Sequence, residues 1–145
     1  MATVPDDIRC EDIMSSPPVT ASPHETASVA AKLMLEKKIG SLIIVDENGS
    51  LLGIVTKTDL VRGVVAPGKD PGKVSLGEIM TRNPYYVTTD SLVREAAEIM
   101  GSYGIGHLPV LHPESQRVVG VISMRDIVRL APHYIELAIL ARQRE

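Results

Sequence analysis

The sequence contains neither tryptophan nor phenylalanine, and four tyrosines are its only large aromatic residues. The hydrophobic core must therefore be built from aliphatic side chains and from the six methionines. Cysteine is almost absent as well, since Cys10 is the single one. One cysteine cannot form an intramolecular disulfide, so we expect the protein to work in a reducing compartment.

Long apolar segments and a strong charge of one sign are also missing. No hydrophobic run approaches the ~20 residues that a membrane-spanning helix requires. The first residues combine neither a basic segment nor an apolar one, so no signal peptide is predicted. The formal net charge of −3 provides no general positive field for a nucleic-acid backbone. These features predict a cytoplasmic globular domain with no membrane partner and no nucleic-acid partner.

The chain contains an internal repeat. At an offset of 66 residues, turn and core positions coincide: Ile13–Met14 with Ile79–Met80, Pro18 with Pro84, Met34 with Met100, and Ile39–Gly40 with Ile105–Gly106. One inserted residue in the second half then changes the offset to 67, and further positions coincide: Gly53–Thr56 with Gly120–Ser123, Asp59 with Asp126, and Val61–Arg62 with Val128–Arg129. Matches at turns, in the core and in one short motif indicate a duplicated unit.

Both halves show the same order of predicted elements. The first half has an extended piece over 19–21, a helix starting at Ser22 with Glu25 closing a capping box, a strand over 41–45, an Asn-Gly turn over 46–49, a strand over 51–55 and a helix from about Thr58. The second half has an extended piece over 85–87, a helix through Leu92 and Tyr103, a strand over 108–111, a turn over 112–115, a strand over 118–122 and a helix from Met124.

A β-α-β-β-α order that occurs twice predicts an α/β (α+β) fold. Each unit leaves one face of a small sheet uncovered, so we expect the two units to pack sheet to sheet with pseudo-two-fold symmetry. The boundaries that we predict are repeat 1 over 1–65, a Pro/Gly-rich linker over 66–73, repeat 2 over 74–130 and a C-terminal helical extension over 131–145. The extension is apolar on more than one stripe, which favours packing against a subunit or a partner.

One motif that occurs in both halves contains polar groups able to bind a ligand. It reads Gly-apolar-apolar-(Thr/Ser)-x-x-Asp, over Gly53–Asp59 and again over Gly120–Asp126. The motif places a hydroxyl at the end of a strand and a carboxylate one helical turn later, beside free backbone N–H groups that suit an anion. Such a set fits a nucleotide, with phosphate at the hydroxyl and ribose at the carboxylate. The alternative is purely structural, because Thr-x-x-Asp at a helix start is also a capping box.

The element order, the Ile-Met…Pro and Ile-Gly segments and the motif, all present in both halves, resemble the cystathionine-β-synthase-type (CBS) domain over residues 8–130. The resemblance implies a regulatory pair that dimerises and binds an adenosyl ligand: AMP, ADP, ATP or S-adenosylmethionine. It implies ribose contacts for Asp59 and Asp126 and phosphate contacts for Thr56 and Ser123. The base would lie against Val19, Thr20 and Ser41 in one cleft and against Tyr85, Tyr86, His107 and Pro109 in the other.

Phosphates require cations, and the two motifs contain Lys57 and Arg125. Each of them could equally be a solvated helix residue. His107, at a predicted strand start, lines the cleft or is an edge polar residue. Because side chains alternate along a strand, only one of Tyr85 and Tyr86 can face the cleft, and both could instead be packing aromatics.

Other functional patterns are not fulfilled. The segment 68–74 resembles a phosphate loop in composition but not in spacing. The four histidines and Cys10 show no zinc-ligand spacing, and no nucleophile with a nearby His-acid pair can be recognised. We therefore predict a regulatory module that senses AMP, ADP or ATP by a change in repeat or dimer geometry, with no catalytic activity and no catalytic cofactor. Its partners would be the adenosyl ligand, a second copy and an unidentified effector protein. The alternatives are a structural dimerisation module and a binder of S-adenosylmethionine.

Overall fold

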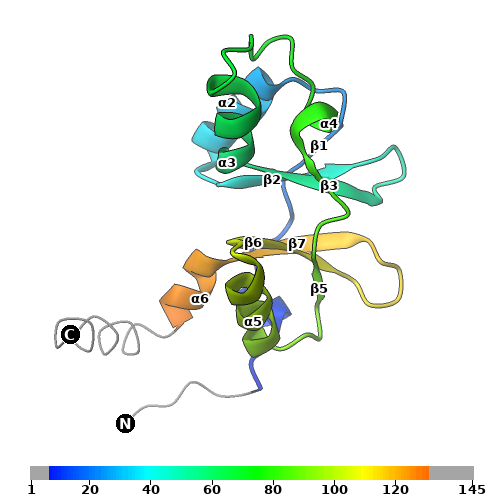
Figure 1. Cartoon of the computed structure of the whole chain (residues 1–145). Coiled ribbons are helices and arrows are strands. Elements are labelled where there is room, and N and C mark those ends of the chain that lie inside the picture. Colours follow the sequence, from blue (N-terminus) through cyan, green and yellow to red (C-terminus); the bar gives the residue numbers. More distant parts are fainter. Residues whose placement is uncertain (1–6, 131–145) are drawn as a thin grey trace, which may run out of the picture.

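Two small β-sheets face each other in the computed structural model, which describes residues 7–130 (Figure 1). The first sheet has the order β1-β2-β3-β4, formed by β1 (Thr20–Ala21), β2 (Ser41–Val45), β3 (Leu51–Thr56) and β4 (Thr81–Arg82). The second has the order β5-β6-β7, formed by β5 (Val87–Thr88), β6 (His107–Leu111) and β7 (Val118–Ser123). In each sheet the first pair of strands is parallel and the next is antiparallel. The fold is therefore the duplicated, sheet-to-sheet arrangement that the repeat predicts.

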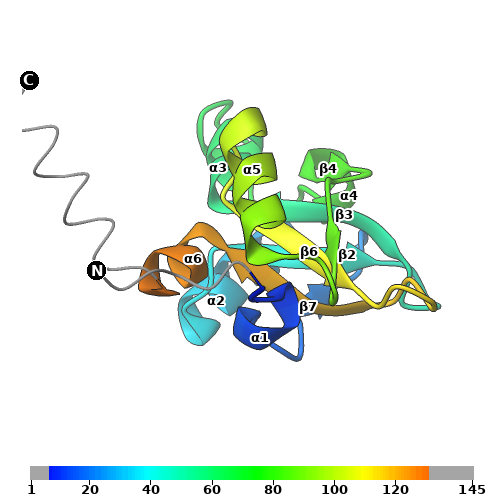
Figure 2. The ribbon, with the colours of Figure 1, turned by 90° about the horizontal axis from the view of Figure 1, so that it is seen from below.

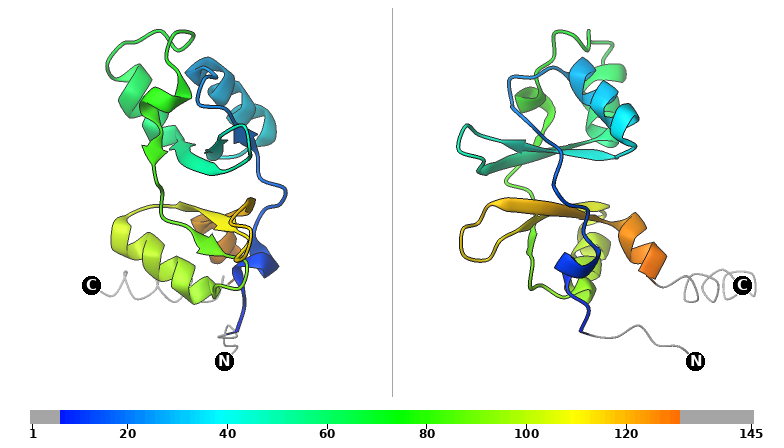
Figure 3. Two further views of the ribbon diagram at one scale, coloured as in Figure 1. Left: turned by 90° about the vertical axis from the view of Figure 1, so that its right-hand side faces the viewer. Right: turned by 180° about the vertical axis from the view of Figure 1, so that it is seen from behind.

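Helices cover the outer face of each sheet (Figures 1 and 3). The first sheet carries α2 (Ala27–Lys37), α3 (Lys57–Leu60), the π-helix η1 (Val61–Val65) and α4 (Leu76–Ile79). The second carries α1 (Cys10–Ile13), α5 (Val93–Tyr103) and α6 (Met124–Leu130). Among the described residues, no helix is both long enough and apolar enough to cross a bilayer. The predicted C-terminal extension over 131–145 lies outside the described residues.

Both faces of each central strand are covered, which explains their nearly continuous apolar sequences. In β2, Leu42 and Ile44 pack in the helix-side cluster of the first sheet, and Ile43, on the opposite face, is also fully buried. In β6 the helix-side residues are Leu108 and Val110, and Pro109 is fully buried between them in sequence. Burial on both faces is what packing of two sheets against each other requires.

The helix predicted to start at Ser22 starts at Ala27 instead, so that prediction was wrong. Thr26 is the N-cap, and its hydroxyl accepts a hydrogen bond from the helix backbone. Residues 22–25 form a separate turn in which the Ser22 N–H donates to a Glu25 carboxylate oxygen at 3.2 Å. The backbone carbonyl of Glu25 accepts from Leu76 N–H at 2.8 Å. The turn stays outside the helix because its backbone is paired with a segment that comes about fifty residues later.

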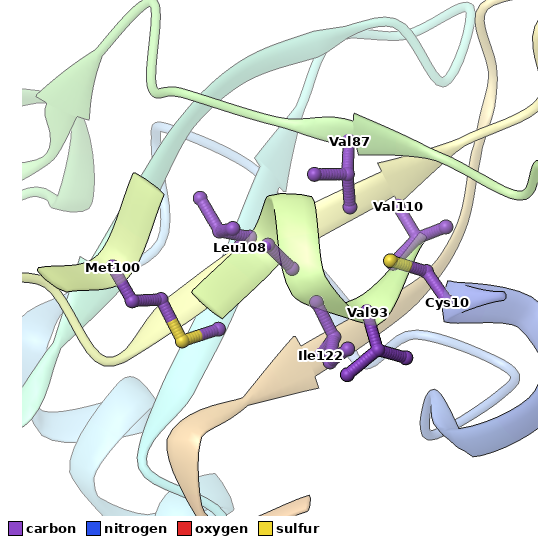
Figure 4. Close-up of a cluster of buried hydrophobic side chains, with 8 residues drawn as sticks. Cys10, Val87, Val93, Met100, Leu108, Val110 and Ile122 are labelled. Atoms are coloured by element: carbon purple, nitrogen blue, oxygen red, sulfur yellow. The ribbon is translucent and has the colours of Figure 1, made fainter. Parts of the chain in front are cut away.

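The segment before each repeat packs on the other repeat. Cys10 of α1 is buried in the cluster of the second sheet with Val87, Val93 and Ile122 (Figure 4). Burial and then the Glu95 carboxylate raise the pKa of the Cys10 thiol to about 11, so the thiol stays protonated. The counterpart, Leu76 of α4, is fully buried in the cluster of the first sheet. In the folded protein, therefore, the segment that precedes the first repeat packs on the second sheet, and the segment that precedes the second repeat packs on the first sheet.

The exchanged segments explain the glycines of the repeated motif. In the first sheet β4 pairs with β3, and in the second sheet Ser15 forms the equivalent bridge to Val121. A Cβ atom at Gly53 would lie 2.6 Å from the Thr81 carbonyl oxygen, and one at Gly120 would lie 2.8 Å from that of Ser15. These distances are too short for any side chain. The glycines therefore serve the close approach of the crossing segment.

Gly120→Ala should therefore destabilise the fold, by about 1–3 kcal/mol, which is the usual cost of overpacking a rigid site. Gly101→Ala is the matched control, because Gly101 lies in α5 and a Cβ atom added there would meet no atom within 4 Å. That variant should be more stable than the wild type by about 0.5–1 kcal/mol. Urea unfolding of the three proteins measures both differences. Equal effects of the two substitutions would contradict the close approach at Gly120.

The two hairpins extend to the same side of the molecule (Figures 1 and 2), and one side-chain hydrogen bond joins them there. The Arg117 guanidinium donates from Nη2 to the Asn48 carbonyl oxygen at 2.6 Å. Asn48 lies in the turn between β2 and β3, and Arg117 immediately precedes β7. The contact links the two sheets at their hairpin end, opposite to the end at which β2 and β6 begin.

Candidate ligand-binding site

A cavity of about 980 Å³ lies between the two sheets and is lined by both repeats. It is found where β2 and β6 begin and β3 and β7 end, so the two copies of the motif contribute to the same space. The sequence predicted two clefts, one for each motif. The structure joins them in one continuous cavity, because the starts of the two central strands face each other across the interface.

The two motif aspartates line this cavity and also form capping boxes. Asp59 Oδ2 accepts from Thr56 N–H at 2.8 Å and lies 3.1 Å from its hydroxyl oxygen. Asp126 Oδ2 accepts from Ser123 N–H at 2.8 Å and lies 3.0 Å from its hydroxyl oxygen. Within residues 7–130, no hydrogen bond engages Oδ1 of either aspartate. The capping interactions thus fix each carboxylate in place and leave one oxygen for a ligand.

Positive side chains outnumber negative ones around the cavity. The lining aspartates are Asp59 and Asp126, whereas the lining cations are Lys37, Lys38, Lys57, Arg62, Arg125 and Arg129. The cavity is therefore cationic in a chain whose net charge is −3. Such a concentration of one sign attracts an anionic ligand into a crevice that a low-dielectric interior partly surrounds.

Four of these cations were not among the predicted site residues. The sequence held a signal for Arg62 and Arg129, because the repeat aligns them and each follows a motif aspartate by three residues. Residues three apart on a helix lie on the same face. Lys37 and Lys38 gave no such signal. They enter the site because α2 ends there, with Lys38 in the left-handed conformation at φ 57° as its C-cap.

His107 lines the cavity at the start of β6 and is partly buried between the repeats. Its sequence position belongs to the second repeat, but its ring reaches the first, since a Cβ atom at Gly40 would lie 3.0 Å from Nε2. Burial lowers the pKa of His107 below its ordinary value of 6.5, Asp126 opposes this change, and Arg125 and Lys57 reinforce it. The imidazole is therefore neutral at neutral pH.

The protein should lose stability in acid through His107. As the pH falls through 6.5 the unfolded chain takes up a proton at this residue, whereas the folded chain resists, so the free energy of unfolding decreases. Urea unfolding at about pH 7.5 and about pH 5.5 measures this loss. His107→Ser removes the group, so this variant should lose less stability between the two conditions. An unchanged pH dependence in the variant would show that His107 contributes nothing to it.

An aromatic pair forms part of the cavity wall. The rings of Tyr85 and Tyr103 stack with their centroids 4.0 Å apart and an interplanar angle of 15°. Both tyrosines line the cavity and both are about half exposed, at 51% and 54%. Tyr103 was predicted only as a helix residue. Its contact with Tyr85 depends on how α5 meets the segment before β5, which the sequence does not show.

Ten of the predicted site residues line the cavity, namely Val19, Ser41, Thr56, Lys57, Asp59, Tyr85, His107, Ser123, Arg125 and Asp126. Three do not. Thr20 is exposed on the edge strand β1, and Tyr86, in the irregular segment before β5, is exposed and does not line the cavity. Pro109 is fully buried and does not reach the cavity. Within residues 7–130, no three His, Cys, Asp or Glu side chains lie close enough to share a metal ion.

Two facing sheets, each with a Thr/Ser-x-x-Asp helix start at a shared cavity, define a class of protein. The family model described as the CBS domain matches residues 10–66 and again residues 76–133. These matches cover most of the chain in two copies. The chain therefore belongs to the CBS domain family, as a tandem pair.

Particular members of the family are closely similar to it. The CBS domain pair of protein MJ0100, solved in complex with 5′-methylthioadenosine and S-adenosyl-L-methionine, is 36% identical with a TM-score of 0.78, and the alignment covers 87% of this chain and 97% of that one. Hypoxic response protein 1 of Mycobacterium tuberculosis (strain H37Rv) is 32% identical over 123 residues, which is 85% of each chain. A crystal structure of Hypoxic Response Protein I with two coordinated zinc ions matches with a TM-score of 0.74, at 31% identity over 83% of this chain and 97% of that chain.

Other relatives are longer than this chain. An uncharacterized protein of Methanopyrus kandleri, MK0525, is 38% identical over 117 residues, and the match covers 81% of this chain and 59% of that protein. L-aspartate semialdehyde sulfurtransferase of Methanocaldococcus jannaschii is 38% identical over 120 residues, which is 83% of this chain and 22% of the enzyme. The activity in that name therefore describes a protein of which this chain matches about one fifth.

Proposed function

We propose that this CBS pair is a regulatory module that binds an adenine nucleotide in the cavity between its repeats and catalyses no reaction. The observation that supports this function is the composition of the cavity wall, which combines the two motif aspartates with six lysines and arginines. A ribose carries two hydroxyl donors for a carboxylate, and phosphates require the cations. One ligand class, the ribonucleotides, carries both groups.

The adenosyl part of the proposal rests on the family. The CBS pair of protein MJ0100 was solved with two adenosyl ligands, and it is 36% identical to this chain. By this likeness, Asp59 and Asp126 are the ribose acceptors and Thr56 and Ser123 face the phosphates. The capping bonds support this assignment, because they engage Oδ2 of each aspartate and leave Oδ1 without a hydrogen bond among residues 7–130.

The charge of the cavity favours AMP, ADP or ATP over S-adenosylmethionine. S-adenosylmethionine carries a cationic sulfonium, which the six lining cations would repel. The phosphates of a nucleotide would instead be neutralised by Lys57, Arg125 and their neighbours. Charge-assisted hydrogen bonds of this kind are roughly twice as strong as neutral ones.

The signal would be a change in the angle between the repeats. The Arg117–Asn48 contact joins the sheets at the hairpin end, and the cavity lies at the other end. A ligand that bridges cations of both repeats would draw the cavity end together about this contact. A population shift of this kind can be read by a partner protein, here an unidentified effector.

The direct test is isothermal titration calorimetry of the full chain with AMP, ADP, ATP and S-adenosylmethionine, with GMP as the control for the base. We expect saturable binding of at least one adenine nucleotide, tighter than that of S-adenosylmethionine and of GMP. At a free ligand concentration of 100 times Kd, binding should also stabilise the folded protein by about 2.7 kcal/mol, which raises its melting temperature. Tightest binding of S-adenosylmethionine would overturn the nucleotide assignment, and no binding of any ligand would favour a structural module.

We also propose that two copies dimerise through the helices of the first repeat. Leu35 on α2 is 82% exposed, and Val61 and Val65 on η1, which follows α3 in the same repeat, are also exposed. Exposed large aliphatic side chains on the helices of one repeat favour a protein–protein contact. Leu35→Asp should convert the dimer to a monomer in light scattering, whereas Glu36→Ala, on the same helix, should leave the dimer unchanged. A wild-type monomer at micromolar concentration would refute this dimer.

A further inference from the structure

The two halves of the cavity are unequal. We propose, resting on the proposed function, that the wild-type chain holds one nucleotide, in the half-site of Asp126, because the His107 side chain occupies the half-site of Asp59. The first half-site is defined by Gly40, Thr56 and Asp59, and the second by Gly106, Ser123 and Asp126. His107 would thus set how many ligands the pair binds.

The two half-sites have matching backbones. Gly40 and Gly106 are equivalent in the repeat, and so are the residues that follow them, Ser41 and His107. Each glycine carbonyl accepts from the N–H of the residue after the motif hydroxyl: Lys57 N–H donates to Gly40 at 3.3 Å, and Met124 N–H donates to Gly106 at 2.9 Å. The space in front of each glycine therefore belongs to the half-site of its own repeat.

These two spaces differ in what fills them. A Cβ atom placed at Gly40 would meet His107 Nε2 at 3.0 Å and Cε1 at 3.3 Å, with Lys57 Cε at 4.0 Å. A Cβ atom placed at Gly106 would meet no atom within 4 Å. The equivalent of His107 is Ser41, whose side chain is too short to cross the interface. The imidazole thus occupies the space directly in front of Gly40, whereas the space directly in front of Gly106 is open.

The other lining residues add to the difference. Asp59 is only 9% exposed, whereas Asp126 is more accessible. The stacked pair of Tyr85 and Tyr103 comes from the second repeat alone, since the equivalent positions hold Val19 and Lys37. A base that enters beside the second repeat therefore meets an aromatic wall, which gives a planar ring more contact than an aliphatic side chain does.

Titration calorimetry with AMP tests the proposal through its stoichiometry. The wild type should bind one AMP per chain. His107→Ser, which places the residue of the first repeat in the second, should bind two. The extra site in His107→Ser should disappear when Asp59→Asn is added. His24→Ser is the matched control, because His24 is an exposed histidine outside the cavity, and this variant should still bind one.

The reciprocal substitution gives an independent test that does not depend on the stability of the His107 variant. Ser41→His should place an imidazole in the open space in front of Gly106. Because the ligand would then have to compete with this side chain for the same space, AMP binding should weaken by about 10-fold or more. Two AMP molecules bound to the wild type, or unchanged binding by Ser41→His, would overturn the proposal. Both outcomes leave the proposed function intact, whereas absence of any nucleotide binding by the wild type would remove the proposed function itself.

Discussion

Replacing Asp126 by asparagine is expected to weaken adenine-nucleotide binding by about 100-fold, the equivalent of roughly 3 kcal/mol. The carboxylate accepts two capping hydrogen bonds at Oδ2 from Ser123 and keeps Oδ1 for the ligand. Asparagine preserves the size of the side chain and one acceptor oxygen, but it cannot accept from two ribose hydroxyls while it caps the helix. Titration calorimetry of the two proteins measures the loss.

Asp12→Asn separates ligand binding from helix capping. Asp12 is also a capping-box aspartate, accepting from Arg9 N–H at 2.9 Å at the start of α1, and it does not line the cavity. Both variants should lose a similar stability, about 1 kcal/mol or less. Only Asp126→Asn should lose nucleotide affinity. If both variants bind nucleotide as the wild type does, the aspartates serve as caps and nothing more.

Leu76→Ala should be among the most damaging single substitutions in the chain, with an expected loss of about 2–5 kcal/mol. Leu76 follows the linker in sequence but is fully buried in the core of the first repeat with Leu42 and Val55. Its removal leaves a cavity among buried side chains, and such a cavity adds to the lost transfer energy. Urea unfolding followed by circular dichroism gives the difference.

Leu42→Ala supplies the comparison, because Leu42 is a residue of β2 in the same cluster and is equally buried. The two variants should lose stability to a similar extent. A loss well under about 1 kcal/mol for Leu76→Ala, with a full loss for Leu42→Ala, would place Leu76 outside that core. The exchange of N-terminal segments between the repeats would then be wrong.

The local pattern of the sequence was sufficient for most of the strands. The strand predicted over 41–45 is β2 without change, and each of the three strands predicted over 51–55, 108–111 and 118–122 is one residue longer in the structure. The hairpin turn forms as its Asn-Gly sequence predicts, with Gly49 at φ 80° and Asp46 accepting from Asn48 and Ser50 N–H. These features depend on neighbours in the chain, so a single sequence contains them.

Contacts between distant segments could not be read in the same way. Ser22 followed by Pro23 and Glu25 is a valid helix start by local rules, and it failed because the backbone of residues 23–27 pairs with 74–77. The strand β4 was not predicted, since two residues give no periodic signal and their pairing with β3 is set by the crossing of the chain. The same crossing decides that the motif glycines face a neighbouring backbone.

The candidate site was predictable where it follows the repeat. The paired aspartates and hydroxyls line one cavity because duplication places them symmetrically. The direction of individual side chains was harder to obtain. His107 was assigned to the second cleft, but its ring reaches Gly40 in the first repeat, and Pro109 was assigned to a cleft but is buried. A period of two tells which residues share a face of a strand, and it does not tell what covers that face.

A crystal structure of the chain with AMP at saturating concentration would test the central claim most directly. It should show one nucleotide between the repeats, with its ribose hydroxyls within hydrogen-bonding distance of Asp126 and its phosphate among the lysines and arginines that line the cavity. A nucleotide bound elsewhere on the surface, or a cavity that stays filled by solvent at saturation, would contradict the account.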